Sequence, residues 1–218
     1  MHVRVNAAMS ADGKLSTRRR EQVAISGERD FERVYRMRAE SDAVVVGVGT
    51  VLADDPSLRT HDEQHREAVG KTGRPARVVA DSRARTPTDA RVLDGEATTY
   101  LLVSDAAPDE RVDTLRERGT EIVRAGDDRV DLAGAFATLD ERGVSELMVE
   151  GGGELIFSLF EAGLVDELSV FVGNVVIGGR DAPTLADGEG FVDAFPELAL
   201  REVERLDEGV LLVWDVEG

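Results

Sequence analysis

Residues 150–155, Glu-Gly-Gly-Gly-Glu-Leu, place two acids around three consecutive glycines. An apolar run typical of a strand precedes them, and an apolar run with helical spacing follows. Glycine loses the most backbone freedom on folding, so three in a row indicate a need for bare main chain. At the start of a helix, unpaired N–H groups and the positive end of the dipole favour an anion such as a pyrophosphate. The segment predicts a phosphate-binding turn. A purely structural turn stays open, because the spacing is not that of a dinucleotide fingerprint.

A second glycine-rich joint, Gly47-Val48-Gly49-Thr50, follows the β-branched run 43–48. Such a run is typical of a strand buried on both faces. Two glycine joints at the carboxyl ends of strands suit a dinucleotide lying across those ends.

Apolar and amphipathic segments alternate along the chain and predict its elements. We expect helices at 28–40, 109–118, 132–142 and 154–162, and strands at 2–9, 43–48, 77–81, 99–103, 121–124, 145–149, 168–172, 200–206 and 210–216. Asp207-Glu208-Gly209 is a hairpin turn between the last two strands. The order predicts an α/β fold with a mostly parallel sheet, an antiparallel C-terminal edge and helices on both faces. Without repeats or linkers, residues 1–218 are expected to form one domain.

The amino-acid composition limits the classes of partner and the cellular location that we expect. A net charge of −18 argues against nucleic acid, whose binding depends on phosphate neutralisation. No apolar run is long enough to cross a membrane, and the N-terminus lacks signal-peptide features, so we expect a cytoplasmic protein. Cysteine is absent, which excludes thiolate chemistry. Only Lys14 and Lys71 among the 26 basic residues are lysines. This composition suits a halophilic, archaeal cytoplasm, where salt screens the self-repulsion; an acidic protein of a GC-rich mesophile is the alternative.

The polar segment 59–74 is expected to be an exposed, mobile loop. It contains His61 and His65 at the spacing of a zinc metalloprotease helix, but the glutamate after the first histidine is missing. Lys71 lies in a sequence that ends like a phosphate-binding P-loop but lacks its first glycine and its preceding strand. We expect neither a zinc site nor a P-loop here.

Several separated motifs occur in an order that resembles one family: MSADGKL, GVGTVLADDPSL, RVVADSRARTP, VEGGGEL with GLVDELSVFV, and IGGRDAPT. They resemble the riboflavin-pathway reductases, whose fold is similar to that of dihydrofolate reductase. Their stand-alone archaeal and fungal members reduce 2,5-diamino-6-ribosylamino-4(3H)-pyrimidinone 5′-phosphate to its ribitylamino counterpart. The chain lacks the zinc-deaminase signature of the fused bacterial form and resembles the stand-alone archaeal form, here a haloarchaeal one. The resemblance also implies a homodimer.

The resemblance implies a nicotinamide cofactor, because no side chain donates hydride. The positions that match cofactor contacts are Thr50, Asp54, Ser82, Arg83, Ala84, Arg85, Thr86, Val130, Gly151, Gly152, Gly153, Glu154 and Leu155. Arg83 and Arg85 suit a ribose 2′-phosphate and therefore NADPH, with NADH as the alternative.

The positions that match substrate contacts are Asn6, Lys14, Arg38, Leu58, Arg59 and Glu150. The cations among them suit the 5′-phosphate. Glu150 suits the sugar hydroxyls, or alternatively caps neighbouring N–H groups. The proton that balances hydride transfer comes from Asp12, Glu150 or water. Two other functions stay open: a reductase of similar fold acting on a pteridine or another imine, and a nucleotide-binding module without catalysis.

Overall fold

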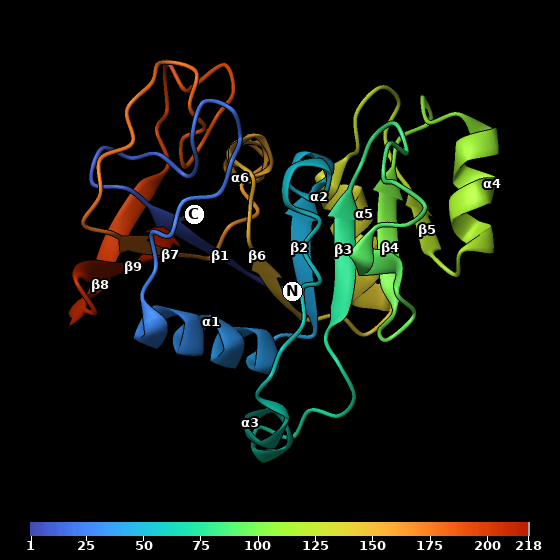
Figure 1. Ribbon diagram of the computed structural model, residues 1–218. Helices are drawn as coiled ribbons and strands as arrows, with labels where there is room; N and C mark the ends of the chain where they lie inside the picture. The colour runs from blue at the N-terminus through green and yellow to red at the C-terminus, as the bar shows by residue number, and fades with distance from the viewer. Residues whose placement is uncertain (218) are drawn as a thin grey trace. The chain divides into compact units, whose positions relative to one another are not determined.

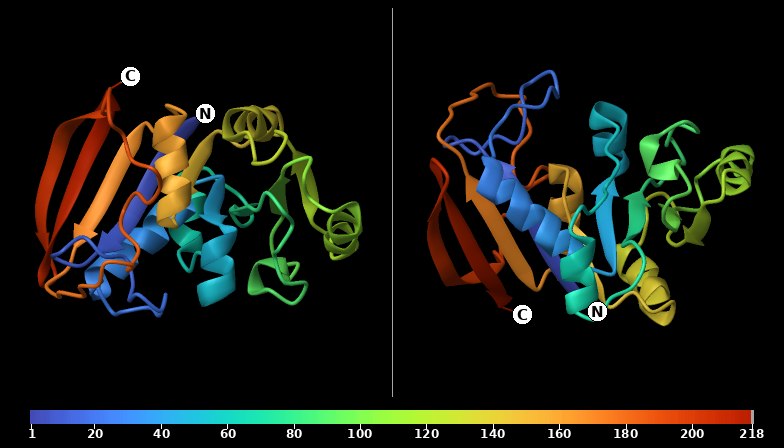
Figure 2. Two further views of the ribbon diagram at one scale, coloured as in Figure 1. Left: turned by 90° about the horizontal axis from the view of Figure 1, so that it is seen from above. Right: turned by 60° about the horizontal axis from the view of Figure 1, so that its bottom comes forward.

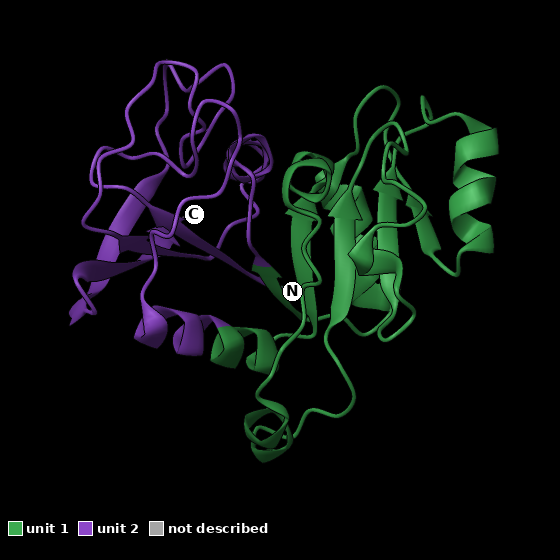
Figure 3. Cartoon of the chain, in the orientation of Figure 1, with its two compact units in different colours: residues 1, 35–148 green, residues 2–34, 149–218 purple. Residues whose placement is uncertain are grey.

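The computed structural model describes residues 1–217 (Figure 1). They form two compact units (Figure 3). The first unit contains Met1 and Tyr35–Met148, and the second contains His2–Val34 and the chain from Val149 onward. The boundaries fall inside helix α1, Glu28–Glu40, and at the end of strand β6, Glu146–Val149.

The first unit contains a parallel sheet. Its strands are β2 (Ala43–Gly47), β3 (Ala76–Ala80), β4 (Thr99–Val103) and β5 (Glu121–Arg124), in the order β5-β4-β3-β2, with β6 next to β2. All three pairs from β2 to β5 are parallel. These strands begin and end within a residue or two of the predicted positions.

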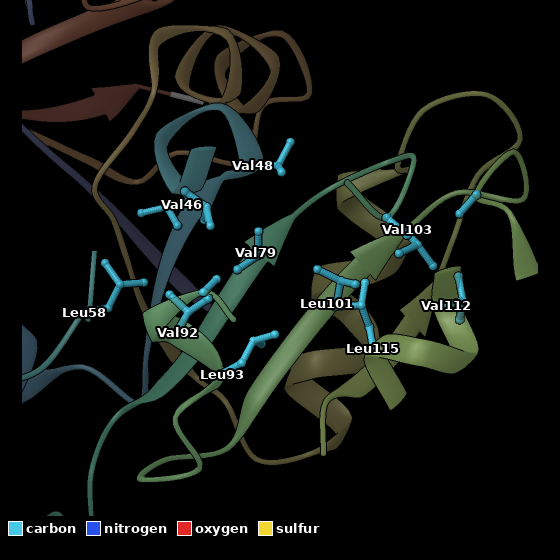
Figure 4. Packing of buried hydrophobic residues seen from close by; sticks show 14 of the residues in the cluster. Val46, Val48, Leu58, Val79, Val92, Leu93, Leu101, Val103, Val112 and Leu115 are labelled. Atoms are coloured by element: carbon cyan, nitrogen blue, oxygen red, sulfur yellow. The ribbon is translucent and has the colours of Figure 1, made fainter. Parts of the chain in front are cut away.

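Helices cover both faces of this sheet, as predicted. On one face, α2 (Val48–Asp54), α4 (Asp109–Glu117) and the short 3-10 helix η1 (Arg91–Leu93) pack on Val46, Val79 and Leu101 (Figure 4). Helix α5, Leu132–Glu141, lies on the opposite side of these strands from α2 (Figure 2). Val44, Val45 and Val46 are all fully buried or nearly so, which explains the uninterrupted β-branched run of β2.

The second unit contains the antiparallel edge. Its strands are β1 (His2–Met9), β7 (Glu167–Val172), β8 (Glu197–Leu206) and β9 (Gly209–Glu217), in the order β1-β7-β9-β8. β1 pairs with β7 in parallel, whereas β9 is antiparallel to both β7 and β8. Helix α6, Gly153–Glu161, follows β6. The predicted mostly parallel α/β fold with an antiparallel C-terminal edge is confirmed.

The predicted hairpin is confirmed, but its glycine lies in the strand after the turn and is needed for close packing. Leu206 pairs with Gly209, so the turn consists of Asp207 and Glu208, and Asp207 takes the left-handed conformation with φ of 49°. Gly209 is required because an added Cβ would meet the main-chain oxygen of Val172 and the ring of Phe171.

The prediction of an exposed loop over residues 59–74 is wrong, because the segment contains a helix and buried side chains. Residues Glu63–Ala68 form helix α3, which begins with the Asp62 side chain accepting a hydrogen bond from His65 N at 3.0 Å. The guanidinium of Arg66 donates to the carbonyl oxygens of Ala39 (2.9 Å), Ser41 (2.7 Å) and Gly73 (2.9 Å) and is only 5% exposed. A buried arginine with three hydrogen bonds to carbonyl oxygens therefore anchors this segment, which has few apolar side chains of its own.

The two histidines of that segment have protein partners. His65 Nε2 lies 2.9 Å from a carboxylate oxygen of Glu40, and the ring of His61 lies edge-on to Tyr35 with centroids 4.9 Å apart. Within residues 1–217, no helix is long and apolar enough to cross a membrane.

Candidate active site

In the first unit, predicted cofactor residues follow the carboxyl ends of three parallel strands, which share one edge of the sheet. β2 leads directly into α2, where Thr50 and Asp54 are four residues apart and therefore on one helical face. Both side chains are half-buried. A Cβ added at Gly49 would meet no atom within 4 Å, so the backbone here borders open space. This joint leaves room for a ligand at the start of α2.

The loop after β3 is held by an aspartate that the sequence did not single out. Asp81 is fully buried, and its Oδ2 accepts hydrogen bonds from Thr86 N (2.7 Å) and Thr86 Oγ1 (2.8 Å). Ala84 takes φ of 52° and is also fully buried. Arg111 donates to the carbonyl oxygens of Ala84 (3.2 Å) and Thr86 (2.8 Å). Ala84 and Thr86 therefore shape this loop, and their side chains face the interior.

Two predicted cofactor contacts from different loops lie side by side. Val130 N donates to Ser82 Oγ at 3.1 Å. Ser104, which follows β4, donates from its hydroxyl to the carbonyl oxygens of Ser82 (2.8 Å) and Asp128 (3.2 Å). The loops after β3, β4 and β5 are joined through Ser82 and Ser104.

The two arginines of the β3 loop point toward solvent. The side chain of Arg83 is 54% exposed and that of Arg85 is 59% exposed. Arg83 lies 3.6 Å from Asp128 Oδ1, and Arg85 lies 3.7 Å from Asp81 Oδ1. Asp81 Oδ1 is buried without a hydrogen-bond partner among the described residues, and Arg85 forms an ion pair with it. Both guanidiniums are accessible to an anionic ligand.

The predicted substrate residues of the first unit separate into two groups. Arg38 and Arg59 are in contact, because Arg38 Nη1 donates to the Arg59 carbonyl oxygen at 2.7 Å. Leu58 has φ of 50° and packs into the core of the first unit at 2% exposure. A contact of Leu58 with a substrate would therefore involve its main chain.

The charge of Arg59 is already paired. Its Nη2 lies 2.7 Å from Asp94 Oδ2 and 3.1 Å from Glu96 Oε1. The hydrogen bond to Asp94 raises the pKa of Arg59. Burial alone would raise the pKa of Asp94, but hydrogen bonds from Arg77 and Arg59 outweigh it and hold that pKa well below its usual range. A phosphate at Arg59 would have to compete with two carboxylates.

In the second unit, the three glycines lie between the end of β6 and the first turn of α6. Gly152 precedes α6, and its carbonyl oxygen accepts from Leu155 N (3.0 Å) and Ile156 N (3.1 Å). The first N–H groups of a helix have no partner within it, so this turn presents donors to an anion. The peptide bond between Gly151 and Gly152 is cis.

The glycines have different reasons for lacking a side chain. Gly151 takes φ of 115°, a conformation open to glycine, and an added Cβ would meet nothing within 4 Å. At Gly153 an added Cβ would collide with the carbonyl oxygen of Thr184 and lie 2.8 Å from Asp187 Oδ2. Gly151 is itself buried but has room where a Cβ would be, whereas at Gly153 that room is filled by the protein.

The other predicted residues near this turn have distinct surroundings. Glu150 follows the end of β6 and is half-buried, and Glu154 is exposed on α6. Leu155 is buried at 7% exposure, so its side chain belongs to the core.

Asn6 is part of a buried polar network. Its Oδ1 accepts a hydrogen bond from Arg33 Nη2 at 2.8 Å, and Arg33 Nη1 donates to Ser169 Oγ at 2.9 Å. Asp30 completes the network with an oxygen 2.8 Å from the same guanidinium. Arg33 was not among the predicted site residues, because nothing in the helical pattern of 28–40 separates it from the solvated arginines around it.

Asp12 holds two loops together. Its oxygens accept from Ser10 Oγ (2.6 Å), Ile177 N (3.0 Å) and Gly178 N (2.7 Å). These bonds, led by that from Ser10, lower the pKa of Asp12 to about 2. The lowered pKa disfavours the protonated form of Asp12 that a general acid needs.

Lys14 lies beside Asp12. Its backbone N donates to Ser10 Oγ at 2.9 Å, and its Nζ donates to the carbonyl oxygen of Ala182 at 3.2 Å. An ammonium group has three donors, so Lys14 retains capacity for an anionic ligand.

Comparison with known proteins adds family relationships. Residues 1–212 match the family model described as the RibD C-terminal domain. A protein of Archaeoglobus fulgidus named 2,5-diamino-6-ribosylamino-4(3H)-pyrimidinone 5′-phosphate reductase is 46% identical over 95% of this chain and 94% of its own length. A protein of the same name from Methanothermobacter thermautotrophicus is 45% identical over 100% of this chain and 99% of its own.

Solved structures share the fold. A pyrimidine reductase-like protein of Corynebacterium diphtheriae aligns with a TM-score of 0.84 at 19% identity. The alignment covers 100% of this chain and 92% of the Corynebacterium chain. The riboflavin biosynthesis reductase of Saccharomyces cerevisiae aligns with a TM-score of 0.73 at 18% identity. The alignment covers 99% of this chain and 90% of the yeast chain. At these identities the likeness concerns the fold alone.

Proposed function

This chain belongs to the RibD C-terminal domain family, and we propose from that premise that it reduces 2,5-diamino-6-ribosylamino-4(3H)-pyrimidinone 5′-phosphate to the ribitylamino compound in riboflavin and deazaflavin synthesis. The observation that carries the proposal is the 46% and 45% identity to two reductases of that name over nearly the whole chain. Because these alignments run along nearly the whole chain, we infer that residues 1–218 are one reductase domain.

The cofactor is NADPH. Three features of this chain fit it. An added Cβ at Gly49 or Gly151 would meet no atom within 4 Å, and this lack of a side chain suits the close approach of a ligand. The first turn of α6 presents N–H groups to a pyrophosphate. The guanidiniums of Arg83 and Arg85 are more than half exposed and suit a 2′-phosphate, which NADH lacks.

Thr50 and Asp54 contact the nicotinamide half, the 82–86 loop and Val130 contact the adenosine half, and residues 151–155 contact the pyrophosphate. A nicotinamide held by these residues would supply the hydride that reduces the sugar C1′ of the open-chain imine. These roles follow the family resemblance, and the open backbone and exposed arginines support them.

The chain's own residues hold the substrate. The candidates for binding the 5′-phosphate are Lys14 in the second unit and, alternatively, Arg38 in the first, and Glu150 accepts hydrogen bonds from the sugar hydroxyls. Arg59, paired with Asp94 and Glu96, supports Arg38 through its carbonyl oxygen. Asn6 and the main chain at Leu58 complete the substrate contacts.

The proton that balances hydride transfer reaches the imine nitrogen of the substrate from Glu150 or from water. Asp12 is the third candidate for the proton donor. Three hydrogen bonds stabilise its carboxylate form, however, and its pKa is lowered to about 2. Its role is to fix the loop that carries Lys14.

We also propose a cytoplasmic homodimer. The phosphorylated biosynthetic substrate supports the location. Exposed apolar residues of the edge strand β8, namely Leu198, Leu200 and Val203, support a second copy at that edge.

Turnover tests the function directly. The purified protein, NADPH and the ribosylaminopyrimidine phosphate are mixed in concentrated KCl, and the absorbance of reduced nicotinamide is followed. Loss of absorbance that needs the substrate supports the proposal. Reduction of a pteridine instead identifies a different reductase, and cofactor binding without oxidation identifies a module without catalysis.

The acidic composition supports a halophilic, archaeal origin. About 2 M KCl screens repulsion among surface carboxylates, so the thermal midpoint should rise between dilute buffer and that salt concentration. A midpoint that falls or stays constant contradicts the halophilic part of the proposal.

A further inference from the structure

Residues 184–191, which we name the α6 strap, lie along the first two turns of α6. Asp187 N donates to the carbonyl oxygen of Gly153 at 3.0 Å. One turn further on, Gly188 lies so close to the ring of Phe157 that an added Cβ would collide with it. The ring of Phe191 is 5.0 Å from that of Phe157, centroid to centroid. The strap therefore contacts the glycine turn at one end and the buried face of α6 at the other.

The part of the strap nearest the glycine turn has a fixed shape. Asp187 Oδ1 accepts from both Thr184 N (3.1 Å) and Thr184 Oγ1 (2.5 Å). This arrangement brings the Thr184 carbonyl oxygen and Asp187 Oδ2 against Gly153, where they leave no room for a side chain. The Asp187 carboxylate thus fixes the conformation of the strap and also packs against the main chain of Gly153.

The strap is also joined to the segment that carries Lys14. Lys14 and Thr184 form an antiparallel β-bridge, and Leu15 N donates to the carbonyl oxygen of Pro183 at 2.9 Å. Lys14 Nζ donates to the carbonyl oxygen of Ala182 at 3.2 Å. Thr184 therefore contacts the lysine segment through its backbone and the glycine turn through its carbonyl and Asp187.

We propose that Thr184 and Asp187 are positioning residues that fix the glycine turn for the pyrophosphate and couple it to Lys14. The inference rests on the proposed function. A glycine turn without this support would sample many conformations, and binding would have to order it. Because Thr184 contacts both places, an anion bound at Lys14 favours cofactor binding at the turn.

Three variants test the positioning role. Asp187→Ala removes the acceptor for both Thr184 donors, Asp187→Asn keeps an acceptor oxygen, and Thr184→Val removes the hydroxyl at nearly constant volume. The matched control is Asp166→Ala, which removes a carboxylate that accepts from Val3 N at 2.7 Å elsewhere in the second unit. The dissociation constant of NADPH is measured by its fluorescence, together with KM and kcat.

We expect the dissociation constant and KM for NADPH to rise about tenfold in Asp187→Ala, the effect of one or two net hydrogen bonds. Asp187→Asn should recover most of that loss, Thr184→Val should lie between them, and kcat at saturating NADPH should stay within about threefold. Adenosine 2′-monophosphate carries no pyrophosphate, so its inhibition constant should not change. The control should match the wild type in every measurement.

The coupling is measured with ribose 5-phosphate as the probe for Lys14. In the wild type it should tighten NADPH binding, and in Asp187→Ala this effect should disappear. If Asp187→Ala binds NADPH as tightly as the wild type, the inference is overturned. Equal weakening of NADPH and adenosine 2′-monophosphate also overturns it, since this indicates general destabilisation. A wild type that binds no NADPH overturns the proposed function as well, which separates the two failures.

Discussion

Asp81 and Thr86 are joined by two hydrogen bonds to a single oxygen, from Thr86 N at 2.7 Å and from Thr86 Oγ1 at 2.8 Å. Both residues are fully buried. The pair closes the loop that carries Arg83 and Arg85, so the position of those arginines depends on a carboxylate that does not face the ligand.

Replacing Asp81 should therefore disturb the loop from within. Asp81→Ala leaves two buried donors of Thr86 unpaired and should lower the free energy of unfolding by roughly 2–4 kcal/mol. Asp81→Asn keeps an acceptor for Thr86 and should cost less than half of that. Urea unfolding of both variants checks this, and equal losses would mean that the charge of Asp81, and not its acceptor role, stabilises the loop.

Arg83 and Arg85 should determine the choice of cofactor. Because both are exposed and suit a 2′-phosphate, Arg83→Ala or Arg85→Ala should lower kcat/KM with NADPH about tenfold and leave that with NADH nearly unchanged. Arg116→Ala, in an exposed arginine of α4, is the matched control. A parallel loss with both cofactors would contradict the assignment of the 2′-phosphate to this loop.

Asp12 should stabilise the second unit only while it is ionised. Its pKa is lowered from 3.8 to about 2 in the folded protein, so its contribution is present above 3.8 and is lost as the pH falls toward 2. Asp12→Asn should therefore unfold at lower urea concentration than the wild type at about pH 6, and the difference should shrink by about pH 3. A difference that stays constant over this range would contradict the role of the ionised carboxylate.

The same variant tests the proton donor. If Asp12 supplied the proton, Asp12→Asn would abolish turnover or remove an ionisation from the pH profile of kcat. We expect a reduced rate with an unchanged profile between about pH 5 and pH 9.

Arg66 should be important for stability although it lies in a polar segment. Arg66→Leu leaves the carbonyl oxygens of Ala39, Ser41 and Gly73 without this donor and should lower the free energy of unfolding by roughly 2–4 kcal/mol. Arg116→Ala should change it by less than about 0.5 kcal/mol, since its partner is an exposed aspartate. Similar values for both variants would show that the Arg66 contacts contribute little.

The sequence predicts the elements well where hydrophobic pattern decides them. The helix Glu28–Glu40 and the strand Thr99–Val103 begin and end at the predicted residues, because their apolar spacing is unambiguous. The sequence predicts a loop around Arg66 because it does not distinguish a solvated arginine from a buried one that donates hydrogen bonds to carbonyl oxygens.

Parts of the site depend on contacts that a single sequence does not reveal. Gly153 looks like a ligand-binding glycine, yet Thr184 and Asp187, about 30 positions later, leave no room for its Cβ. Asp81 precedes the predicted loop, and its bonds to Thr86 become apparent only when the chain turns at Ala84. The residue types predict which loops bind the ligands, but the side chains that organise those loops become apparent only from the tertiary packing.

The most direct measurement of the central claim follows the hydrogen itself. NADPH carrying deuterium at the transferred position of nicotinamide C4 is incubated with the protein and the ribosylaminopyrimidine phosphate, and the product is analysed by mass spectrometry and NMR. The account predicts one deuterium at the sugar C1′ of a ribitylamino product. A product without deuterium, or no product while the cofactor stays reduced, would contradict it.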